Sequence, residues 1–115
     1  MLTKEQILGA NDLVKESVAV PEWGGEVWVR GMTGSARSQY EESIYDANHK
    51  GIKLFNIHAK LAAAAICDES GKLLFSQHEI EQLGQKSACA LDRIAEVALR
   101  LSRLRAEDVD DLRGN

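Results

Sequence analysis

The segment at residues 20–34, VPEWGGEVWVRGMTG, constrains the fold more than any other part of the chain. It holds both tryptophans, the single proline and four of the nine glycines. The runs SVAV and EVWVR flank PEWGG, and in the second run Val27 and Val29 alternate with polar or aromatic residues, as in a half-buried strand. Pro21 removes a ladder donor and the glycines permit positive φ, which suits a tight connection. The sequence therefore predicts a β-hairpin over residues 17–30 with its valines facing a core.

Helical periodicity accounts for most of the chain outside the hairpin. Thr3 and Gln6, and later Ser76 and Glu79, have the spacing of a capping box that starts a helix. We predict an α+β protein, a single mainly α-helical domain over residues 1–115 with an N-terminal β-hairpin. The helices expected after the hairpin are residues 33–45, 52–66, 77–83 and 88–104, and an acidic C-terminal turn is expected at residues 106–112.

Composition excludes several classes of function. The formal net charge of −4 argues against nonspecific nucleic-acid binding, which needs a basic face. The longest apolar run, residues 61–67, is far shorter than the roughly 20 residues that cross a bilayer, and the start MLTKEQ is too polar for a secretory signal. The two cysteines have no Cys-x-x-Cys pairing and are interpreted as unpaired small hydrophobes in a reducing compartment. We expect a soluble cytoplasmic protein that binds neither nucleic acid nor membrane.

No group of residues indicates catalysis, a cofactor or a metal. His49, His58 and His78 lack a second His or Cys at metal-ligand spacing, and the glycines of GGEVWVRGMTG match no phosphate-binding pattern. The turn DESGK begins like a calcium loop, but Lys72 and Leu73 stand where that loop needs a ligand and a glycine. The sequence predicts that the protein is not an enzyme and has no catalytic, cofactor-binding or metal-binding residues.

The charges are unevenly distributed along the chain. Residues 47–67 contain no acid, and Lys53 and Lys60 in this stretch are seven positions apart, on one face of the predicted helix. The acidic end of the chain includes Asp110 and Asp111. Two interpretations remain open. These are either two solvated faces, or a basic patch on one copy that meets the acidic tail of another in head-to-tail assembly.

The tryptophans also allow two interpretations. Alternation along the second strand predicts that Trp28 and Arg30 point away from the face that the valines bury, while Trp23 lies in the connection. Either one tryptophan covers the helical core, or at least one marks a surface for a partner or another subunit. We take Trp23, Trp28 and Arg30 as candidates for such a surface.

Several segments together resemble the tail assembly chaperones of long-tailed bacteriophages and their prophages. They are LTKEQIL, VPEWGGEVWVRGMTG, the helix containing YEES, CDESGKLLFS and LGQKSACALDRIAEVALRLSRL, and the likeness covers nearly the whole chain. The most specific piece is residues 20–34. One departure is GSARSQY, where the family pattern leads us to expect a more charged start of the helix.

The resemblance implies a non-enzymatic assembly factor in the bacterial host cytoplasm. Such a protein binds the long tape measure protein, prevents its aggregation and promotes polymerisation of the tail tube around it. It self-associates, as a ring or a spiral, and is not retained in the virion. In many members a programmed frameshift produces a longer form that contacts the tail tube protein. The alternative from another class is a small structural phage protein of the head–tail connector or neck. A small enzyme and a helix-turn-helix regulator are more distant alternatives.

Overall fold

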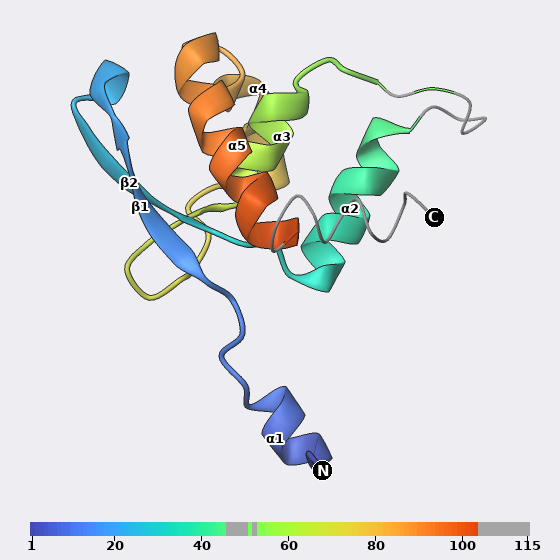
Figure 1. Cartoon of the computed structure of the whole chain (residues 1–115). Helices are drawn as coiled ribbons and strands as arrows, with labels where there is room; N and C mark the ends of the chain where they lie inside the picture. Colours follow the sequence, from blue (N-terminus) through green and yellow to red (C-terminus); the bar gives the residue numbers. More distant parts are fainter. Residues whose placement is uncertain (46–50, 52, 104–115) are drawn as a thin grey trace.

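The computed structural model describes residues 1–45, 51 and 53–103. The elements in chain order are α1 (Lys4–Leu8), β1 (Lys15–Val20), a 3-10 turn (Pro21–Trp23), β2 (Gly25–Arg30), α2 (Gly34–Ile44), α3 (Ile57–Ala63), β3 (Ile66–Cys67), a second 3-10 turn (Gln77–Glu79), α4 (Ile80–Leu83) and α5 (Ala88–Arg103). In this part of the chain, α3, α4 and α5 lie beside a small antiparallel sheet (Figure 1), which confirms the predicted α+β class with a hairpin.

The hairpin formed by β1 and β2 starts two residues earlier than its sequence pattern predicted. Its register runs from the pair Lys15 and Arg30 to the pair Val20 and Gly25. The connection is a 3-10 turn that begins at Pro21 and ends at Gly24, which has a φ of 75°. Only glycine adopts this left-handed conformation without steric cost, so the clustered proline and glycine residues set the length of the turn.

The helix predicted over residues 52–66 is wrong at both ends. α3 begins only at Ile57, because Asn56 has a φ of 57° and a left-handed residue cannot continue a right-handed helix. At the other end, Ile66 pairs with Val29 and the next residue pairs with Trp28, which forms β3. The alanine run favours a helix locally, but the free edge of β2 pairs with Ile66 and Cys67, which follow the run, as a third strand.

The helix caps agree with the sequence patterns more closely. Both capping boxes form, with the Thr3 hydroxyl accepting from the N–H of Gln6 at 3.2 Å and Ser76 paired with Glu79. The helix predicted over 77–83 divides into the second 3-10 turn and α4. Residue 104 of the last predicted helix, and the acidic turn at 106–112, lie outside the described residues.

Among the described residues, two groups of apolar side chains make up the interior. The main core joins the inner face of the sheet to α3, α4 and α5, and its fully covered members include Val20, Val29 and Ile94. A second cluster is centred on Met32, Leu61 and Ala95, and α2 packs against it through Ala36 and Tyr40. α2 therefore rests on a smaller apolar surface than the sheet and α5 do.

Two arginines of α5 hold the hairpin through bidentate ion pairs. Arg100 binds Glu16 of β1 with nitrogen–oxygen distances of 3.0 and 2.6 Å, and Arg93 binds Glu22 of the turn at 2.8 and 3.3 Å. The hydrogen bonds from Arg93 lower the pKa of Glu22 from 4.5 to about 2, and those from Arg100 lower the pKa of Glu16.

The depressed pKa of Glu22 predicts an acid-dependent loss of stability. The pair with Arg93 stabilises the folded protein at pH values above about 4.5, and this contribution disappears as the pH falls through about 2. We expect Glu22→Gln to unfold at a lower urea concentration than wild type at pH 7, and the two midpoints to converge near pH 2. Glu81→Gln is the control, since Glu81 forms no ion pair in the described part of the chain. A difference for Glu22→Gln that stays constant with pH would contradict the prediction.

The helix α1 stands apart from the rest of the protein. None of its residues is buried, and Figure 1 shows it separated from the sheet and from α2–α5 by an extended link. The link is fixed at its far end, where the carbonyl oxygen of Val14 accepts a hydrogen bond from the N–H of Gly31 at 3.0 Å.

Candidate functional site

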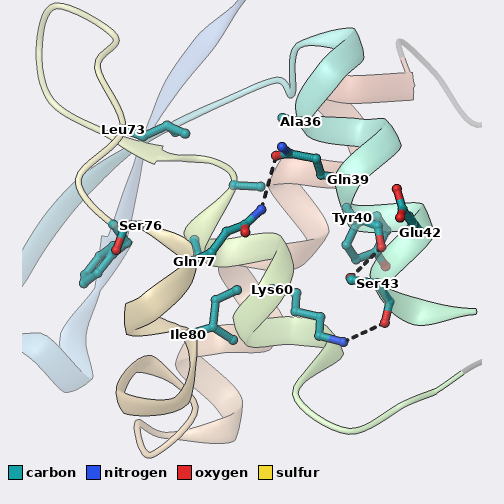
Figure 2. Close-up of a pocket in the computed structure, with 13 residues that line it drawn as sticks. Ala36, Gln39, Tyr40, Glu42, Ser43, Lys60, Leu73, Ser76, Gln77 and Ile80 are labelled. Atoms are coloured by element: carbon teal, nitrogen blue, oxygen red, sulfur yellow. Dashed lines mark hydrogen bonds between the residues drawn. The ribbon is translucent and has the colours of Figure 1, made fainter.

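A groove of about 640 Å³ lies between α2, α3 and the segment at residues 73–80 (Figure 2). α2 forms one wall, the C-terminal end of α3 forms the floor, and the segment leading into α4 forms the other wall. The apolar part of its lining consists of Ala36, Tyr40, Ala63, Ala64, Leu73, Phe75 and Ile80.

Two hydrogen bonds connect the parts of the groove, one between the floor and a wall and one between the two walls. Lys60 of α3 donates from Nζ to the carbonyl oxygen of Ser43 at 3.1 Å, which places a positive charge at the C-terminal end of α2, where the helix dipole favours it. Across the mouth, Gln77 Nε2 donates to Gln39 Oε1 at 3.2 Å, and Figure 2 shows these two side chains directed toward one another. The groove thus has a rim of amides and one carboxylate, that of Glu42, around an apolar interior.

The chemistry of the groove suits the binding of an apolar surface. Alanines on the floor let a bound backbone approach closely, while the aromatic rings and Ile80 offer apolar contacts, as in grooves that receive the apolar face of a helix. Among residues 1–45, 51 and 53–103, no three His, Cys, Asp or Glu side chains are grouped to hold a metal ion. Over the same residues, no helix has the length and apolar character needed to span a membrane.

The structure separates the two tryptophans. Trp23 packs against the main core beside Val27, so it covers the core and does not share the outer face of the sheet. Trp28 lies on that outer face, half-buried, with Lys15 Nζ 4.6 Å from its ring centroid, a cation–π contact. Of the two interpretations of the tryptophans, cover of the helical core therefore describes Trp23, whereas Trp28 lies on the outer face with Arg30.

The turn after β3 covers part of the outer face. Arg30 Nη1 donates to the carbonyl oxygen of Gly71 at 2.7 Å, and Lys15 Nζ donates to that of Glu69. Beneath them Cys67 is buried opposite Trp28, and this burial raises the pKa of its thiol. Arg30 and Lys15 hold this turn in place, so the outer face is less open than the sequence suggested.

The carboxylate of Asp68 shapes the same turn from within. It accepts hydrogen bonds from the N–H and hydroxyl of Ser70 at 2.9 and 2.7 Å, and from the N–H of Lys72 at 3.0 Å. The hydrogen bond from the Ser70 hydroxyl contributes most to lowering the pKa of Asp68. Asp68 organises the loop itself, as Asx turns do.

The predicted basic patch is not on one helix face. Lys53 precedes α3 and is exposed, whereas Lys60 lies within α3 and is bound to the end of α2. The left-handed Asn56 between them ends the helical register on which the prediction depended. Asp110 and Asp111 lie outside the described residues, so contact between a basic region and the acidic tail stays a prediction.

Sequence reasoning did not identify the groove. Its walls and floor come from three separate segments of the chain, and no local sequence pattern indicates that these segments lie together. One signal was present, since the alanine run at 62–65 indicates a surface that another helix can approach closely.

Comparisons with known proteins agree on one family. A family model described as phage tail assembly chaperone matches residues 4–114. Among solved structures, the chain is similar to the tail assembly chaperone of bacteriophage HK97, with a TM-score of 0.63 and 26% sequence identity over 84% of this chain and 94% of that one. The comparison with curated proteins found no match. Since the family model spans nearly every residue, the chain belongs to the phage tail assembly chaperone family.

Proposed function

We propose that the protein keeps the tape measure protein soluble during tail assembly by holding its apolar helical segments in the groove. The observation that carries this proposal is the groove between α2, α3 and residues 73–80, with its apolar interior and alanine floor. A long helical client exposes many apolar faces before the tube closes around it, and a groove of this kind removes such a face from water.

The wider role follows from the same proposal. The protein acts by binding alone, without catalysis, in the bacterial host cytoplasm, and several copies cover one client. It helps tail tube subunits to polymerise around the tape measure protein and leaves before the virion is complete. A longer, frameshifted form brings the tail tube protein to the same assembly.

Co-expression tests the proposal. The tagged chain is produced together with the tape measure protein of the same phage, and the soluble, co-purifying amount of the latter is measured. We expect wild type to retain the tape measure protein, and Ala64→Phe, which fills the floor of the groove, to reduce the co-purified amount about tenfold or more. Ala19→Phe is the matched control, because Ala19 is exposed on β1, and it should retain the client.

Two outcomes would contradict the proposal. One is full retention of the tape measure protein by a folded Ala64→Phe variant, which would show that the groove is not the binding site of the tape measure protein. The other is recovery of head or neck proteins, without the tape measure protein, from cells that produce the phage. That result would favour a structural protein of the head–tail connector or neck.

A further inference from the structure

The α1 arm, which we define as residues 1–8, exposes an unusual amount of apolar surface. Its large apolar side chains are 58–122% exposed, namely Met1, Leu2, Ile7 and Leu8. A helix of five residues is too short to persist by itself in water, yet its capping box is complete. The arm is thus organised as a helical turn, and its apolar side is exposed in the described part of the chain.

The arm is directed away from its own groove. Its link is fixed to the body by the hydrogen bond between Val14 and Gly31, and Figure 1 shows α1 extending from this point away from α3 and α5. An apolar segment presented in this way is available to a neighbouring molecule.

The groove matches the arm in chemistry and charge. Its apolar interior suits the side chains of Ile7 and Leu8, and its alanine floor admits a helical backbone. At the rim, the exposed Glu42 has no ion pair in the described part of the chain, while the Lys60 ammonium group is bound to Ser43. Lys4 on the arm provides the positive charge that Glu42 lacks.

We propose that the α1 arm of one copy occupies the groove of a second copy. Because each chain has one arm and one groove, the contact joins different surfaces and allows either reciprocal exchange in a dimer or extension along a series of copies. Where the groove is also the client site, which rests on the function proposed above, the arm covers it until a client displaces it. The arm therefore regulates access to the groove.

Sedimentation velocity of the purified chain, without any client, tests the contact. We expect wild type to sediment with a mass above the 12.7 kDa of one chain, and the Ile7→Asp, Leu8→Asp double variant to raise the dissociation constant about tenfold or more. Phe55→Asp is the matched control, since Phe55 is 81% exposed and lies outside both arm and groove, and its association should equal that of wild type. A monomeric wild type, or an arm variant that associates as wild type does, overturns the proposal.

Disulfide formation shows whether the arm occupies the groove of a second copy or the groove of its own chain. In a Cys89→Ser background, a tagged Leu8→Cys chain is mixed with an untagged Gln39→Cys chain under oxidation. We expect a disulfide between the two chains, and none when the second cysteine replaces Ser17 on the outer face. If a chain carrying both Leu8→Cys and Gln39→Cys forms only an internal disulfide, the arm occupies its own groove and the proposal fails.

The two proposals fail in different measurements. If the intermolecular disulfide does not form but the tape measure protein is still captured, only the proposed arm contact is contradicted. If the disulfide forms but the tape measure protein is not captured, only the proposed client is contradicted.

Discussion

Ile94→Ala should lower the free energy of unfolding by about 2–5 kcal/mol. Ile94 lies on α5, is 0% exposed, and belongs to the main core that joins the sheet to α3 and α5. Removing its side chain takes away buried apolar contacts and leaves a cavity that the surrounding sheet and α3 cannot fill completely. Since domains of this size are stable by about 5–15 kcal/mol, the loss is a large part of the total.

Urea denaturation followed by circular dichroism measures the effect. The graded control is Ile94→Val, which removes one methyl group and should cost about 0.5–1.5 kcal/mol. An Ile94→Ala variant as stable as Ile94→Val would show that the site collapses around the smaller side chain, contrary to the tight packing described above.

The second large effect is expected for Ala62→Leu, at about 1–3 kcal/mol of destabilisation. Ala62 is 0% exposed on α3 and is part of the main core with α5. A larger side chain at this position forces α3 away from α5 or into an unfavourable rotamer, because the alanines set the distance between the helices.

The free energy of unfolding of Ala62→Leu is compared with that of Ala88→Leu, where the alanine is exposed at the start of α5. The control should change stability by no more than about 0.5 kcal/mol. Equal values for the two variants would contradict the tight packing of α3 in the main core.

Local sequence patterns predicted the elements whose causes are local. The capping boxes at Thr3 and Ser76 form because each side chain and its backbone partner are three residues apart. The hairpin follows from alternation and from the turn chemistry of Pro21 and Gly24. The amphipathic stripe of α5 likewise places Ile94 in the core.

Local sequence patterns did not predict features that depend on contacts between residues far apart in the sequence. β3 exists because Ile66 and Cys67 meet the free edge of β2, which the alanine-rich run does not indicate. Asn56 takes a left-handed conformation with its side chain against Gly84, the C-cap residue of α4. The separation of Trp23 from Trp28 depends on how the turn of the hairpin meets the core.

The candidate site was predictable only in part. Trp28 and Arg30 do lie on the face opposite the buried valines, as alternation predicted, but Lys15 and the turn after β3 partly cover them. The apolar residues of α1 would ordinarily be assigned to a core, and nothing in their spacing indicates that the helix stands away from the body.

The position of the groove between two separate apolar groups affects how it opens. One wall, α2, packs on the cluster around Met32 and Leu61, while the opposite wall, at Phe75 and Ile80, packs on the main core. Displacing α2 disrupts only the smaller group, so we expect its amide hydrogens to exchange through a local opening that costs less free energy than global unfolding. The groove can then adapt its width to helices of different diameter while the sheet and α5 remain intact.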